Sequence, residues 1–129
     1  MNAAALQGIT KRIIYLDDDL AKRLAAKEVL DHLGHDTTLF KNSAEAKDAI
    51  LDRSVAWDIV IMELWMSGPS GIDIAKSIME RRPELRFAVV AGEYVEAPDG
   101  DEGCVNRYRV FPKPTTAQEF ASLIKYVFE

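Results

Sequence analysis

The stretch Ile13–Asp19 reads IIYLDDD, a short β-prone run that stops at three aspartates. A second run of this kind, Asp58–Glu63, reads DIVIME and also finishes on a carboxylate. Nearly continuous apolar runs of this length are typical of strands in a parallel sheet that is buried on both faces. The two runs therefore predict a parallel sheet whose strands lead into acidic side chains.

The rest of the chain alternates similar runs with amphipathic stretches. Further strands are expected at 37–40, 87–91 and 110–111. Helices are expected at 20–33, from Asn42 or Ser43 through Arg53, from 72 to 79 ahead of Pro83, and from a Thr116-x-x-Glu119 capping box to Phe128. This alternation implies right-handed crossovers and an α/β fold with a doubly wound sheet. The functional crevice of such a sheet lies at the carboxyl ends of its strands.

One stretch departs from the alternation. Residues 93–108 read EYVEAPDGDEGCVNRY, where a further helix would be expected. Pro98, Gly100 and Gly103 disfavour a helix, as does the acidic cluster around them. We therefore expect the fourth helix to be short, distorted or absent, in a loop or a disordered segment.

Length and composition limit the class of protein. The 129 residues are enough for one domain, which we expect at 12–129 after a leader at 1–11. The net charge of −5, with both signs mixed along the chain, argues against a nucleic-acid surface. The single cysteine, Cys104, excludes a disulfide within the chain and fits a reducing compartment. No secretory signal or membrane span is recognisable, so we expect a cytoplasmic protein.

Four charged residues stand where the predicted strands end. Asp17 and Asp18 follow the first strand, Glu63 ends the third and Lys113 follows the fifth. Carboxylates that share a small cleft raise one another's pKa unless a cation offsets them. Mg²⁺ takes oxygen ligands of this kind. The arrangement therefore predicts a cation site, a lysine salt bridge, or both.

These residues resemble the receiver domains of bacterial response regulators. The resemblance runs from about Arg12 to Phe128 and rests on four motifs in order: Leu16–Asp19, Asp58–Met66, Gly71 and Lys113–Pro114. It implies a five-stranded CheY-like, flavodoxin-like sheet with strand order 2-1-3-4-5. It also implies a cis peptide bond ahead of Pro114, a bond type that is almost confined to X-Pro.

The resemblance assigns a role to each residue of the cluster. Asp17 and Asp18 match the acidic pair that holds Mg²⁺, and the backbone carbonyl of Trp65 matches the group that completes the metal site. Glu63 falls where the phosphoacceptor aspartate belongs. Lys113 matches the lysine that pairs with the phosphoryl group.

Three positions depart from the family pattern. Glu63 extends its carboxylate one methylene farther than aspartate, on the order of 1.5 Å. Ala91 stands where a switch serine or threonine would bond a phosphoryl oxygen, and Val110 stands where a switch aromatic ring would rotate. Together these departures indicate a pseudo-receiver that is not phosphorylated in the usual way.

The expected function is therefore signalling through protein contact rather than enzymatic catalysis. The resemblance implies a histidine kinase, a phosphotransferase or an output protein as the partner, with the first helix and the surface of strands four and five as contact faces, and it leaves a homodimer open. Two alternatives also stay open. One is a phosphorylatable receiver with an atypical Mg²⁺ site, and the other is a small-ligand or enzymatic domain on the same fold.

Simpler interpretations apply to some of the same residues. Asp19 is expected to be only a helix N-cap. His32 and His35 flank a helix end, where histidines are more typically surface residues or partners of the helix dipole than metal ligands.

Overall fold

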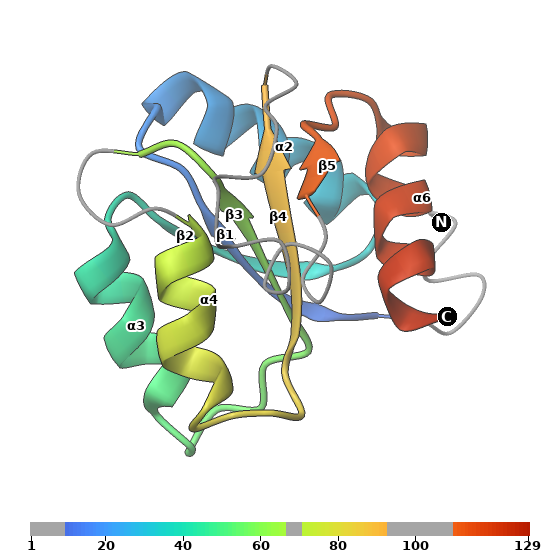
Figure 1. Ribbon diagram of the computed structural model, residues 1–129. Coiled ribbons are helices and arrows are strands. Elements are labelled where there is room, and N and C mark those ends of the chain that lie inside the picture. The colour runs from blue at the N-terminus through green and yellow to red at the C-terminus, as the bar shows by residue number, and fades with distance from the viewer. Residues whose placement is uncertain (1–9, 67–70, 93–109) are drawn as a thin grey trace.

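Five parallel strands form one sheet, in the order β2-β1-β3-β4-β5, in the computed structural model, which describes residues 10–66, 71–92 and 110–129 (Figure 1). The strands are β1 (Arg12–Leu16), β2 (Asp36–Phe40), β3 (Ile59–Glu63), β4 (Arg86–Ala91) and β5 (Val110–Pro112). The helices are α2 (Leu20–His32), α3 (Ser43–Leu51), α4 (Gly71–Met79) and α6 (Ala117–Phe128). The expected fold class and strand order are confirmed. The expectations for the leader up to residue 9 and for the 93–108 stretch lie outside the described residues.

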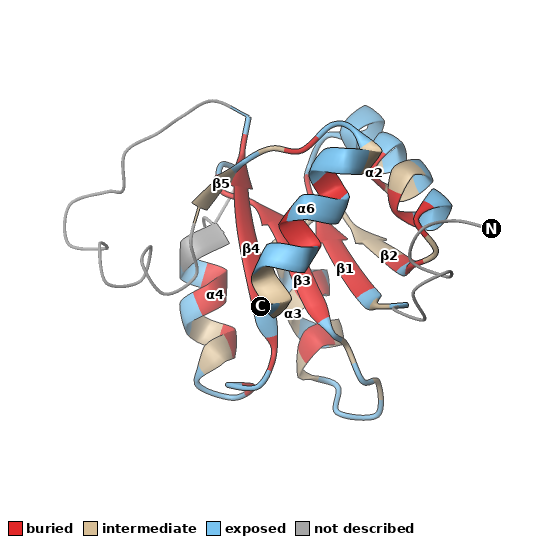
Figure 2. Cartoon of the chain, turned by 90° about the vertical axis from the view of Figure 1, so that its right-hand side faces the viewer, coloured by how far each residue is buried: buried red, intermediate tan, exposed pale blue. Residues whose placement is uncertain are grey.

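Helices cover both faces of the sheet, α2 and α6 on one face and α3 and α4 on the other (Figures 1 and 2). Successive side chains of a strand point to opposite faces. Ile13 and Tyr15 of β1 accordingly pack in the core under α2 and α6, while Ile14 and Leu16 pack in the core against α3 and α4. This burial on both faces explains why the central strands are nearly continuous apolar runs.

The helix caps largely follow the sequence signals. The Asp19 carboxylate accepts a hydrogen bond from the Lys22 backbone amide, and it caps α2 as expected. Thr116 and Glu119 form the expected reciprocal capping box of α6. This box places the start of α6 at Ala117, shortly after Lys113 and Pro114.

Some boundaries differ from the expected ones. The third strand ends at Glu63 as expected but begins at Ile59, so Asp58 lies outside it. Asn42, not Ser43, caps α3, which ends at Leu51 instead of Arg53. The backbone of Asp52 is extended, and its carboxylate accepts hydrogen bonds from the amide and hydroxyl of Ser54, so a local turn replaces the last helical turn.

His35 is buried, in contrast to the expected surface position, while His32 is exposed at the end of α2. The Nδ1 atom of His35 accepts a hydrogen bond of 3.0 Å from the Lys11 backbone amide. That bond ties the segment before β1 to the start of β2, and burial alongside the charge of Lys11 lowers the pKa of His35 below 6.5. The ring is therefore a structural acceptor that must stay neutral.

Acid should destabilise the domain partly through His35. The unfolded chain binds this proton more readily than the folded one, so the contribution of His35 is present above pH 6.5 and is lost as the pH falls through its lowered pKa. We expect His35→Asn to lose less stability than wild type between about pH 7 and about pH 5.5. Urea unfolding at both pH values measures this, with His32→Asn as the exposed control. An equal loss in wild type and His35→Asn would exclude the effect.

Candidate functional site

The carboxyl ends of β1, β3 and β5 bring three of the predicted residues together. Asp17 follows β1, and its amide donates to the carbonyl of Phe40 at the end of β2 over 3.2 Å. Glu63 is the last residue of β3. The amide of Lys113 donates to the carbonyl of Ala91 over 2.9 Å, which continues the β4–β5 ladder by one residue. Backbone hydrogen bonds thus fix the main-chain positions of Asp17 and Lys113.

The Lys113 ammonium lies between the two carboxylates. It donates a hydrogen bond to Oδ2 of Asp17, and it lies 2.8 Å from Oε2 of Glu63. The side chains of Lys113, Glu63 and Asp17 are only 10%, 10% and 2% exposed. The sequence left open a lysine salt bridge or a cation site, and the structure contains a buried salt bridge with two carboxylates on one ammonium.

The electrostatic balance of this cluster depends on Lys113. Burial alone would lower the pKa of the Lys113 ammonium, but its contacts with Asp17 and Glu63 outweigh that effect and raise it. Lys113 therefore stays charged at neutral pH and is the buried cation that offsets the two carboxylates. Such an ion pair depends strongly on both partners, because removing one leaves an uncompensated buried charge.

The two carboxylates are held differently. Oδ1 of Asp17 accepts a hydrogen bond of 3.0 Å from the Asp19 amide, so both of its oxygens have donors. Oε2 of Glu63 is buried, and its contact with Lys113 lacks the geometry of a hydrogen bond. Within the described part of the chain this oxygen has the Lys113 charge beside it but no hydrogen bond.

Asp18 and Trp65, the other two predicted metal ligands, are exposed. Asp18 is exposed, whereas its neighbour Asp17 is 1% exposed, so the acidic pair divides between solvent and the buried cluster. The Trp65 side chain follows β3 and is about half exposed. The described side chains include no group of three or more carboxylate, histidine or cysteine residues placed to hold a metal ion.

The carboxylates of this site are suitable ligands for Mg²⁺, but their positions are not. Carboxylate oxygens are the ligands that this ion prefers. Yet the position between Asp17 and Glu63 is taken by an ammonium group, and Asp18 lies at the surface. As the side chains lie, they do not fit a three-carboxylate magnesium site.

The two residues that the family resemblance marks as switch positions lack the expected hydroxyl and aromatic ring. Ala91 is buried at the end of β4, where its side chain packs in the core on the side of α3 and α4, while its carbonyl accepts a hydrogen bond from the Lys113 amide. Val110 pairs with Val89 and packs against the core on the side of α3 and α4. The described residues contain no cis peptide bond, so the cis bond expected ahead of Pro114 is wrong for this structure.

Tyr15 belongs to the site although the sequence reasoning missed it. Its ring is buried under α2 and α6 and packs on Phe120, with 6.3 Å between the ring centroids. Burial raises the pKa of Tyr15 to about 12, although the charge of Lys113 opposes the shift. The available signal was a hydroxyl-bearing residue in an otherwise aliphatic strand, two positions before Asp17.

Comparison with known proteins finds response regulators among the proteins similar to this chain. No family model matches the chain. It is 25% identical over 113 residues to the DNA-binding transcriptional regulator NtrC of Azospirillum brasilense, covering 88% of this chain and 23% of that protein. It is 24% identical over 115 residues to the response regulator receiver protein CpdR of Brucella abortus, covering 89% of this chain and 94% of that protein.

A solved structure of a response regulator has a similar fold. The response regulator TrrA from Thermotoga maritima, in complex with Mg²⁺–BeF, superposes with a TM-score of 0.75 at 22% identity, covering 91% of this chain and 98% of that one. The chain thus spans about a quarter of the length of NtrC and nearly all of CpdR and TrrA. No helix in the described residues is both long enough and apolar enough to span a bilayer.

Proposed function

We propose, from the premise that this chain is a response-regulator receiver domain with the CheY-like fold, that it works as a pseudo-receiver in two-component signal transduction. In this proposal the domain accepts no phosphoryl group at position 63 and acts through protein–protein contact. The observation that carries the proposal is the buried ion pair in which Glu63 lies 2.8 Å from the Lys113 ammonium.

The length of Glu63 supports this proposal. Its extra methylene moves the carboxylate by on the order of 1.5 Å relative to aspartate. In-line transfer of a phosphoryl group depends on placement at this scale, and an error of about 1 Å can cost roughly a hundredfold in rate. The longer side chain also brings its negative charge to Lys113, the residue that would otherwise pair with the phosphoryl group. Glu63 thereby acts as a permanent substitute for that charge.

The switch positions support it independently. A hydroxyl on residue 91 would be needed to bond a phosphoryl oxygen from the β4 side, and Ala91 has none. Val110 has no ring that could change position in response. A phosphoryl group, even if bound, would find neither the usual hydrogen-bond donor nor the usual aromatic reporter.

The proposed output is binding to another protein. Leu20 and Leu24 lie one turn apart on α2 and are 60% and 55% exposed, which is unusual for large apolar side chains placed together. This face of α2 and the surface of β4 and β5 are the proposed contact regions. A histidine kinase, a phosphotransferase or an output protein is the proposed kind of partner, and a homodimer is one form that the contact could take.

A second candidate is a phosphorylatable receiver with an atypical metal site, and the oxygen donors at the strand ends favour it. In that case Asp17, Asp18, Glu63 and the carbonyl of Trp65 would hold Mg²⁺, and the ion would neutralise charge on the phosphoryl oxygens. Lys113 would then have to leave its place between the carboxylates. We rank this candidate second for that reason.

The two candidates predict different responses to Mg²⁺ and beryllofluoride. We expect the amide NMR spectrum of the wild-type protein to show no saturable change at the ends of β1, β3 and β4, because the Lys113 ammonium already occupies the place between Asp17 and Glu63. Glu63→Asp should respond, since its shorter carboxylate leaves Lys113. Glu45→Asp, at an exposed position on α3, is the matched control. Saturable changes at these strand ends in the wild-type protein would favour the second candidate.

A further inference from the structure

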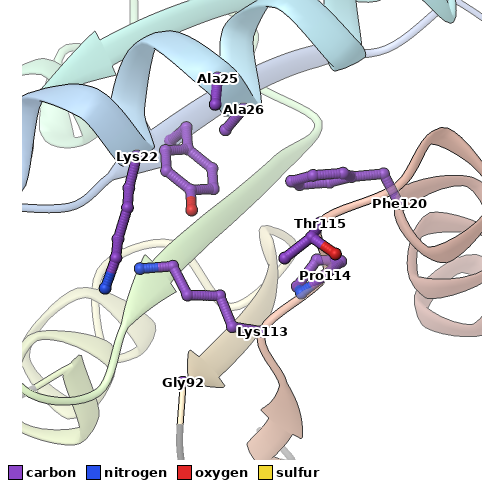
Figure 3. Close-up of a pocket in the computed structure, with 9 residues that line it drawn as sticks. Lys22, Ala25, Ala26, Gly92, Lys113, Pro114, Thr115 and Phe120 are labelled. Carbon is purple, nitrogen blue, oxygen red and sulfur yellow. The ribbon is translucent and has the colours of Figure 1, made fainter.

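A cavity of about 250 Å³ lies between α2, the segment after β5 and the start of α6 (Figure 3). Ala25 and Ala26 of α2, Pro114 and the Phe120 ring form most of its apolar lining, and Figure 3 shows the Phe120 ring extending from α6 toward α2. Apolar pockets with a few converging polar groups are typical of small-molecule sites. The volume is just below the range for drug-sized ligands, so it suits a smaller molecule.

The hydroxyl of Tyr15 is the polar group that indicates a ligand. Tyr15 lines the cavity, is 1% exposed, and its hydroxyl takes part in none of the hydrogen bonds among the described residues. This hydroxyl is not among the buried polar atoms that lack a partner, and at the wall of the cavity it is available to a molecule held there. A phenol is neutral at physiological pH and can donate its proton to an acceptor oxygen.

The charges around the cavity indicate which kind of acceptor oxygen a ligand would present to the Tyr15 hydroxyl. Lys22 and Lys113 also line the cavity, and ammonium groups only donate hydrogen bonds. Lys113, however, is already offset by Asp17 and Glu63, and a second anion would meet those carboxylates. Next to Lys113, the surroundings therefore favour an acceptor oxygen that carries no full charge, such as an amide carbonyl.

We propose that this cavity binds a small uncharged aromatic carbonyl compound, of which a primary aromatic amide is the simplest. The ring packs between Ala26 and Phe120, and the carbonyl oxygen accepts a hydrogen bond from Tyr15. Because Lys113 belongs both to the cavity lining and to the ion cluster, an occupied cavity would give the domain a chemical input. The inference stands on the cavity and Tyr15, whether or not Glu63 accepts a phosphoryl group.

Titration of the full chain with benzamide, followed by amide NMR, tests the proposal. We expect saturable shifts at residues of the cavity lining, with a dissociation constant on the order of 1 mM, as befits a ligand of few atoms. Benzoate and benzylamine should bind more weakly. Tyr15→Phe keeps the ring but loses the donor, and should weaken benzamide binding roughly fivefold.

Variants separate the cavity from other surfaces. Ala25→Phe places a ring in the cavity from an exposed position on α2 and should abolish the shifts, while Ala121→Phe, exposed on α6 and outside the cavity, should retain them. The proposal is overturned by absent shifts, by shifts that survive Ala25→Phe, or by tighter binding of benzoate than of benzamide. A crystal soaked with benzamide that places only water on the Tyr15 hydroxyl would overturn it as well.

Discussion

Replacing Lys113 with methionine will destabilise the domain by about 3–5 kcal/mol, the usual cost of removing one partner from a buried ion pair. The substitution leaves Asp17 and Glu63 buried beside each other without the cation that lies between them. Methionine keeps most of the length and apolar bulk of the lysine stem, so lost packing contributes little. Urea unfolding at neutral pH measures the difference in the free energy of unfolding.

Two further variants isolate the charge effect. Lys125→Met, at an exposed position in the last turn of α6, should change stability by less than about 0.5 kcal/mol. Adding Glu63→Gln to Lys113→Met should recover part of the loss, because one of the two unpaired charges is removed. A Lys113→Met variant within about 1 kcal/mol of wild type would mean that the cluster is open to solvent, contrary to its burial.

Much of the fold was predictable because local signals agreed with one another. The apolar run ending at Asp17 and the run ending at Glu63 indicated buried parallel strands, and the Thr116 capping box located the start of the last helix. In a parallel sheet the carboxyl ends of the strands meet at one edge, so the meeting of Asp17, Glu63 and Lys113 followed from topology.

The remaining features depend on packing between residues far apart in the chain. Lys113 and Asp17 are separated by 96 positions in the chain. No local sequence pattern predicts that the Lys113 ammonium lies between two carboxylates instead of pointing toward solvent. The burial of His35 depends on the backbone of Lys11, which a sequence pattern does not place. The cavity at Tyr15 arises from the gap between α2, α6 and the segment after β5, and so it also lay beyond the sequence signals.

Glu63→Asp will convert the domain into a phosphoryl acceptor, with a rate of uptake at least about a hundredfold above that of wild type. The shorter side chain withdraws its carboxylate by on the order of 1.5 Å from the Lys113 ammonium. That withdrawal frees an oxygen to attack a phosphodonor and leaves Lys113 available to pair with the incoming group. Asp17 keeps its place in the site through its bond with the Asp19 amide.

The most direct measurement is the intact mass of wild type and Glu63→Asp after parallel incubation with acetyl phosphate and Mg²⁺, sampled over time. A Glu63→Asp/Asp17→Asn double variant serves as the control for uptake at that site. We predict that Glu63→Asp gains one phosphoryl group, while the wild-type protein and the double variant stay unmodified. Uptake by the wild-type protein at a rate within about tenfold of Glu63→Asp, against the hundredfold gap expected from the displaced carboxylate, would contradict the pseudo-receiver account.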